Sequence, residues 1–164
     1  MTADLGERLA EFPNVVGLKW ATPDHGMMEF ESVVARFADR LSIIDNQLRF
    51  VTSHMLGARA VEVHICNHWP EWGVRLWGML EQGRYKEAQH ELMTVALPFY
   101  QLWSEMEKHT SGDGYLDKLC MELVGLDSSR CRPPTRDVRE RFREQARRML
   151  IGCGTPRVQT TSNP

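Results

Sequence analysis

Lys19 is the first residue of this chain whose chemistry needs an explanation, because it directly follows a short apolar run, Val15-Val16-Gly17-Leu18. Burying an ammonium group without a partner is costly. One explanation is a lysine at the end of a strand whose amine extends into solvent. The other is an amine that attacks a carbonyl carbon to form an imine, which requires a site that favours the unprotonated form. The run by itself does not decide between the two.

The segment His64-Ile65-Cys66-Asn67-His68 is a second candidate for chemistry. In an extended segment the side chains of His64, Cys66 and His68 would project to one side, and all three can ligate zinc. No fourth ligand follows at a regular spacing, and three ligands define a zinc site only loosely. We therefore predict that these residues line a pocket or pack in the core and that they hold no metal. His64 could still act as an acid or base, because imidazole titrates near neutral pH.

The elements around Lys19 alternate between strand and helix. Apolar patterning predicts strands near 15–19, 42–45 and 60–64, with helices over 27–37 and 50–56 between them. Connections this short favour parallel pairing, which would place Lys19 at the end of the sheet where barrel enzymes build their sites. Three strands cannot close a barrel, so their outer edges are expected to be unpaired.

From Trp69 onward the pattern predicts helices almost without interruption. The tryptophans fall at helical spacing, which is typical of core or interface positions. We predict that Pro98 kinks the second helix, that Thr135 caps the last one, and that the segment from 154 to 164 is a disordered tail. The predicted helices cover residues 69–82, 88–106, 115–124 and 135–151.

Composition limits the class of protein. The 164 residues are 42% hydrophobic and 26% charged, with a net charge of −2, so no general attraction to nucleic acid is expected. No apolar run is long enough to cross a bilayer, and no signal peptide is recognisable. The four cysteines are widely spread. These features predict a soluble, cytoplasmic protein that binds neither nucleic acid nor membrane.

The surroundings of Lys19 are similar to a known signature. Pro13-Asn14-Val15-Val16-Gly17-Leu18-Lys19-Trp20-Ala21 resembles the segment around the Schiff-base lysine of the dihydrodipicolinate synthase/N-acetylneuraminate lyase family, on the sixth strand of its barrel. Four further similarities follow in the family's order, and together they cover roughly residues 10–153. They are Leu56-Gly57-Ala58 before the last strand, Asn67 with Pro70, Gly83-x-Tyr85-x-x-Ala88 and Arg132-Pro133-Pro134.

The resemblance implies a fold and an activity. Residues 1–153 would form the C-terminal part of a TIM (β/α)8 barrel, an α/β fold with about three parallel strands, followed by a helical region. Lys19 would form an imine with pyruvate or a related 2-keto acid, in a class I lyase, an aldolase or a dehydratase. The family needs no cofactor beyond this covalent imine, and it assembles into homodimers or tetramers.

The chain departs from the family's pattern near the expected site. Where the family has a glycine after its seventh strand, this chain has Ile44-Asp45-Asn46-Gln47, and its eighth strand carries Glu62 and His64. We predict that Asp45, Asn46, Glu62 and His64 contact the substrate, which would make the protein a divergent member.

The family's paired threonines and its tyrosine for proton transfer lie upstream of the lysine, and only 18 residues precede Lys19 here. We therefore expect a truncated chain that is inactive by itself. Two alternatives remain. One is a non-catalytic barrel fragment or interaction module, and the other is a small metal-binding module built on His64, Cys66 and His68.

Overall fold

The computed structural model describes residues 3–20 and 28–159, and the chain divides into two compact units, residues 1–63 and 64–164. This boundary subdivides the domain predicted over residues 1–153. Ala21 and Met27, which belong to the predicted patterns, lie outside the described residues. Each unit is described by itself.

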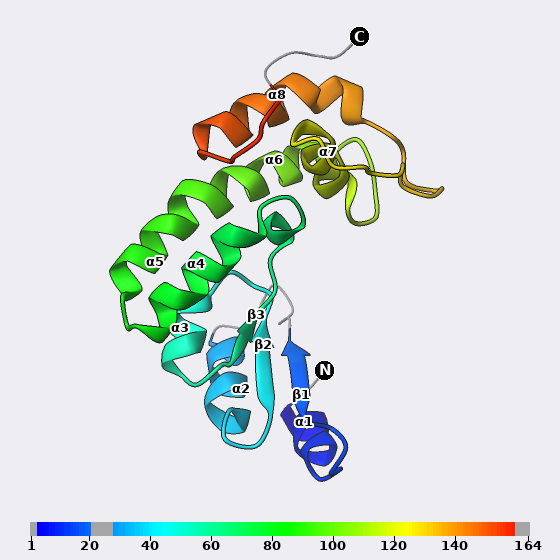
Figure 1. Cartoon of the computed structure of the whole chain (residues 1–164). Coiled ribbons are helices and arrows are strands. Elements are labelled where there is room, and N and C mark those ends of the chain that lie inside the picture. The colour runs from blue at the N-terminus through cyan, green and yellow to red at the C-terminus, as the bar shows by residue number, and fades with distance from the viewer. Residues whose placement is uncertain (1–2, 21–27, 160–164) are drawn as a thin grey trace. The chain divides into compact units, whose positions relative to one another are not determined.

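Unit 1 contains a parallel sheet with the strand order β1-β2-β3, as the sequence predicts (Figure 1). Two strands differ from their predicted bounds. β1 begins at Gly17 rather than near residue 15, and β3 ends at Val61 rather than near residue 64. The elements are α1 (Ala3–Ala10), β1 (Gly17–Trp20), α2 (Glu29–Phe37), β2 (Ser42–Asp45), α3 (Phe50–Met55) and β3 (Ala60–Val61).

One face of this sheet is covered by the core of unit 1. Helix α2 presents four buried apolar side chains at helical spacing, and Ile43 of β2 is buried in the same cluster. Leu18 of β1, paired in register with Ile43, packs against the cluster. Because successive side chains of a strand point to opposite faces, Lys19 and Ile44 point to the other face. The α2 residues are Phe30, Val33, Val34 and Phe37.

Unit 2 is helical, as predicted, and the stripe Trp69, Trp72, Leu76 and Leu80 is buried. The segment from His64, which was expected to extend the third strand, is instead a short 3-10 helix, so that prediction is wrong. No helix within the described part of the chain is long and apolar enough to cross a membrane. The elements are η1 (His64–Asn67), α4 (Pro70–Glu81), α5 (Tyr85–Glu91), η2 (Leu92–Ala96), α6 (Leu97–Glu107), α7 (Tyr115–Leu123) and α8 (Arg139–Gly152).

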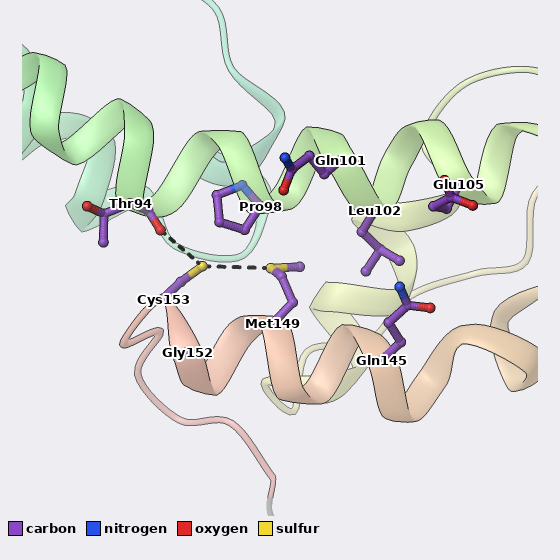
Figure 2. Close-up of a pocket in the computed structure, with 9 residues that line it drawn as sticks. All are labelled: Thr94, Pro98, Gln101, Leu102, Glu105, Gln145, Met149, Gly152 and Cys153. Carbon is purple, nitrogen blue, oxygen red and sulfur yellow. Dashed lines mark hydrogen bonds between the residues drawn. The ribbon is translucent and has the colours of Figure 1, made fainter.

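The long helix expected around Pro98 is interrupted by a π-helical segment, η2, where Leu97 N donates to Leu92 O. Pro98 has no N–H to offer the carbonyl of Thr94 four residues earlier. Figure 2 shows the thiol of Cys153, at the end of α8, pointing at this carbonyl, and the Sγ to O distance is 3.6 Å. Burial raises the pKa of Cys153, which favours the protonated thiol that can donate this hydrogen bond. A side chain from another helix therefore partners the carbonyl that Pro98 leaves without its helical donor.

Helix α8 begins three residues later than a helix capped by Thr135 would. Thr135 is not its cap, because the helix starts at Arg139. The carboxylate of Asp137 accepts the backbone N–H of Arg139 at 3.1 Å and also binds its guanidinium. A residue two positions before the helix thus satisfies one of its first free N–H groups.

Part of the tail predicted to be disordered has defined contacts. Thr155 is buried, and Gln159 N donates to Leu123 O at 2.8 Å. Arg147 Nε donates to Gln159 O at 2.9 Å. Residues 160–164 lie outside the described residues.

Candidate active site at the strand ends

Lys19 and Glu62 meet at the carboxyl ends of the parallel strands. Lys19 is the second-last residue of β1, and Glu62 directly follows β3. Lys19 Nζ lies 3.2 Å from Glu62 Oε2, and the two side chains are 52% and 38% exposed. The pair bridges from β1 to the end of β3 across the central strand β2. Parallel pairing places these residues at one edge of the sheet although they are far apart in sequence.

Asn46 lies at the same edge, directly after β2. Pairing continues one residue past β3, because Glu62 N donates to Asp45 O at 2.8 Å. Continuing the alternation of β2 places Asn46 on the face of Ile44 and Lys19. Its Oδ1 is buried, and it has no hydrogen-bond partner among the described residues. A buried acceptor without a donor costs free energy, which makes Asn46 a candidate for contact with a bound hydroxyl or water.

Asp45 lies on the opposite face from Asn46. It is fully buried, and its carboxylate accepts hydrogen bonds from Ser53 Oγ of α3 and from Gln47 N, each at 2.6 Å. Burial raises the pKa of Asp45, although these hydrogen bonds act in the opposite direction. The carboxylate therefore fixes the turn from β2 into α3. These two neighbours, both predicted to bind substrate, therefore face opposite ways, as the alternation of side chains along a strand requires.

His64 belongs to unit 2, where its ring is held by a carboxylate and an indole. Nδ1 of His64 lies 2.7 Å from Asp117 Oδ2, and the ring centroid lies 4.6 Å from that of Trp103. Asp117 is buried, on the apolar side of α7. This partner lies 53 residues away from His64 and was not predicted from the sequence. One feature of the sequence could have indicated this contact. Asp117 falls among the apolar positions of a predicted amphipathic helix, and a buried carboxylate needs a partner.

The side chains of Cys66 and His68 have different neighbours from that of His64. The segment is helical, so the expectation that alternate side chains share one side is wrong. His68 is buried and stacks on Phe99 with ring centroids 5.9 Å apart, and burial lowers its pKa to about 4. Cys66 Sγ packs so closely on Gly73 that a Cβ there would clash. Among the described residues no three side chains of the metal-binding types are grouped to hold an ion. The absence of a metal remains a prediction.

The arrangement at the strand ends combines a primary amine with a carboxylate in contact with it. An amine is a nucleophile toward ketones once it loses its proton, and an adjacent carboxylate can accept or return that proton. Asn46 adds an amide with an unused acceptor. Lys19 and Asn46 lie on the face of the sheet opposite the core of unit 1.

Comparison with known proteins identifies the family of the chain. The model of the dihydrodipicolinate synthetase family matches residues 1–151 of the chain. No protein with a curated description matches it. The family match covers nearly the whole sequence and includes Lys19 and the strands that carry it. The chain therefore belongs to the dihydrodipicolinate synthetase family.

Proposed function

We propose that Lys19 is the imine-forming residue of a class I lyase, an aldolase or a dehydratase that acts on pyruvate or a related 2-keto acid. The observation that carries the proposal is the position of Lys19 at the carboxyl end of β1, in contact with Glu62, in a chain of this family. The carboxyl ends of parallel strands are where barrel enzymes place their reactive groups. The covalent imine makes a separate cofactor unnecessary for this step.

Glu62 is proposed to carry the proton. Its carboxylate takes a proton from the Lys19 ammonium, and the neutral Nζ adds to the C2 carbonyl of the keto acid to give a carbinolamine. Glu62 returns the proton to the carbinolamine hydroxyl, which leaves as water, and the nitrogen becomes a protonated imine. The resulting cation lies beside the Glu62 carboxylate, so the ion pair of the free site is restored. Asn46 Oδ1, a buried acceptor without a partner among the described residues, is proposed to accept a hydrogen bond from the carbinolamine hydroxyl.

The proposed reaction needs a more enclosed site than the described strands provide. A barrel of this type closes with eight strands, and the described residues contribute three. Both Lys19 and Glu62 are more than one third exposed. An open site does not hold the substrate against the amine, and this positioning is worth up to about 7–11 kcal/mol in the best cases. We propose that Lys19 reacts efficiently only when further strands complete the barrel.

Borohydride reduction followed by mass spectrometry tests the imine. The chain and a protein in which the barrel is complete are each incubated with pyruvate and reduced, and the modified residue is located by peptide mapping. We expect efficient labelling of Lys19 in the complete barrel and poor labelling in the 164-residue chain. Lys19→Arg abolishes labelling, whereas Lys86→Arg, at a surface lysine of α5, leaves it unchanged.

The variant Glu62→Gln distinguishes the proposed role of Glu62, as proton carrier, from that of Lys19, as nucleophile. This variant is expected to slow labelling at least about tenfold in the complete barrel while the modified residue stays Lys19. Labelling that persists in Lys19→Arg would refute the assignment of the lysine. An unchanged labelling rate in Glu62→Gln would refute the role of the carboxylate alone.

A further inference from the structure

A basic hollow of about 660 Å³ lies in unit 2 between the end of α6 and the start of α8. It is formed by the loop that follows α6 and by the connector that precedes α8, and none of the described residues that line it is acidic. Its polar side chains are Lys108, His109, Thr110, Ser111, Arg136 and Arg141. Small molecules bind in concave sites, where polar side chains fix their orientation.

A hydrogen bond and a close backbone approach join the two loops that form the hollow. Thr110 Oγ1 donates to the backbone carbonyl of Arg136 at 2.7 Å. Gly112 has a φ of +89°, and a Cβ at this position would lie 2.6 Å from Thr135 Oγ1, so only glycine allows this approach. These contacts hold the backbone of Arg136 beside the loop that carries His109 and Ser111.

The carboxylates near the hollow pair with other cations than its two arginines. Arg143 and Arg147 on α8 each pair with a glutamate three residues before them, and Lys108 pairs with Glu105. Neither Arg136 nor Arg141 pairs with a carboxylate in the part of the chain that the structure describes. Two guanidinium groups at one hollow without a counterion favour the binding of an anion.

Arg141 and His109 are oriented by the same aromatic ring. The Arg141 guanidinium carbon lies 5.4 Å from the centroid of Phe142, and the His109 ring lies 5.8 Å from it. Arg141 Nη1 donates to His109 Nδ1 at 3.2 Å. Because Nδ1 accepts this bond, the proton of the neutral imidazole lies on Nε2, where it can be donated to a ligand.

We propose that this hollow binds a phosphate group, either as free phosphate or as a small phosphate monoester. Arg136 and Arg141 would neutralise its charge, and His109 Nε2 and the Ser111 hydroxyl would donate hydrogen bonds to its oxygens. Arginine presents several N–H donors in a fixed plane, which suits the oxygens of phosphate. The site belongs to unit 2 alone and does not depend on the chemistry at Lys19.

Isothermal titration calorimetry of the full chain with inorganic phosphate, glycerol phosphate and citrate, at constant ionic strength, tests the site. We expect saturable binding of phosphate or of the monoester, and weaker binding of citrate. Arg136→Gln and Arg141→Gln should each weaken phosphate binding at least about tenfold, as the loss of a charge-assisted hydrogen bond predicts. Both arginines are exposed, so the variants should fold, and circular dichroism checks this.

Arg148→Gln is the matched control, because Arg148 is an exposed arginine of α8 that does not line the hollow. It should change the affinity less than about twofold. Tighter binding of glycerol phosphate than of phosphate would identify a monoester, and the reverse would identify free phosphate. Equal weakening by Arg148→Gln would overturn the proposal, because it would indicate a general charge effect or a broad polyanion surface. Citrate binding as tight as phosphate, or no phosphate binding at all, would also overturn it.

Discussion

Burial moves the pKa values of Asp45 and His68 in opposite directions for one reason, which is that it disfavours the charged form of each group. The pKa of Asp45 is raised, and that of His68 is lowered to about 4. Neither residue lies where the proposed chemistry occurs. Asp45 fixes the turn between β2 and α3, and His68 packs on Phe99. Both therefore link the stability of their own unit to pH.

For Asp45, the native state binds the proton more tightly than the unfolded chain, where the carboxyl titrates near pH 3.9. The stability that this provides is full below about pH 4 and is lost as pH rises through the raised pKa of the native state. We expect the free energy of unfolding of Asp45→Asn not to fall in this way, because an amide does not titrate. The amide can still bind Gln47 N and Ser53 Oγ. Urea unfolding between about pH 4 and 7 should show the variant gaining stability relative to the unsubstituted protein as pH rises. The exposed Asp39→Asn is the control, and a difference independent of pH would contradict the argument.

For His68 the sign is reversed. The unfolded chain binds a proton below about pH 6.5, whereas the native state stays neutral until its pKa of about 4. Stability is therefore lost as pH falls through this window, by up to about 3 kcal/mol. His68→Phe keeps a ring against Phe99 but cannot titrate, so its unfolding free energy should fall less on acidification. His90→Phe, at an exposed histidine of α5, should behave like the unsubstituted protein. Equal acid sensitivity in His68→Phe would show that another group is responsible.

At the scale of the elements, the π-helical segment η2 allows Pro98 to lie within a long helical run. A proline inside an α-helix removes one hydrogen bond and crowds the preceding turn. Here the helix widens just before Pro98, and the thiol of Cys153 reaches the carbonyl of Thr94. The contact between η2 and the end of α8 therefore depends on an irregularity in one helix.

A double-mutant cycle measures the coupling free energy between Cys153 and Pro98. Cys153→Ala should destabilise the protein by at most about 1 kcal/mol, because it removes a weak donor from a carbonyl that lacks its helical partner. The same change in a Pro98→Ala background should cost less, since the alanine restores a backbone N–H that can bind the carbonyl of Thr94. Cys153→Ser, which keeps a donor, is the control. Equal effects of Cys153→Ala in both backgrounds would show that the thiol and the proline are not coupled.

At the scale of the whole molecule, the edge of the sheet suggests self-association. Among the described strands β1 pairs only with β2, so its other edge is unpaired, and Val16 beside it is 74% exposed. Unpaired edges and exposed apolar residues favour association, and we predict a homodimer or tetramer. Whether β1 takes part is open to direct test.

Sedimentation velocity provides that test. Val16→Lys places a charge at the edge of β1 and should shift the protein toward smaller species. Val74→Lys is the matched control, because Val74 on α4 is 75% exposed and distant in sequence. We expect its distribution to match that of the unsubstituted protein. A monomer before any substitution, or an equal shift by Val74→Lys, would contradict the prediction.

Much of the fold could be predicted from the sequence because it depends on local patterning. The apolar spacing in α2 identified the helix and its buried face, and the short runs around Ile43 and Leu18 identified the strands. Short connections then required parallel pairing. The start of α8 was misplaced because Asp137, two residues before the helix, accepts the N–H of Arg139. The segment at η1 was wrongly expected to be extended, and its His64 contacts Asp117, which is 53 residues away.

The sequence by itself determined the family, the parallel strands and the place of Lys19 at a strand end, because each follows from residue order and spacing. Only the tertiary structure decided which side chains meet there. Strand register brings Glu62 to Lys19, and the packing of α3 gives Asp45 its partner Ser53. Packing of α7 gives His64 its carboxylate partner, Asp117. These contacts join residues far apart in the chain, and their geometry is fixed by packing rather than by the local pattern.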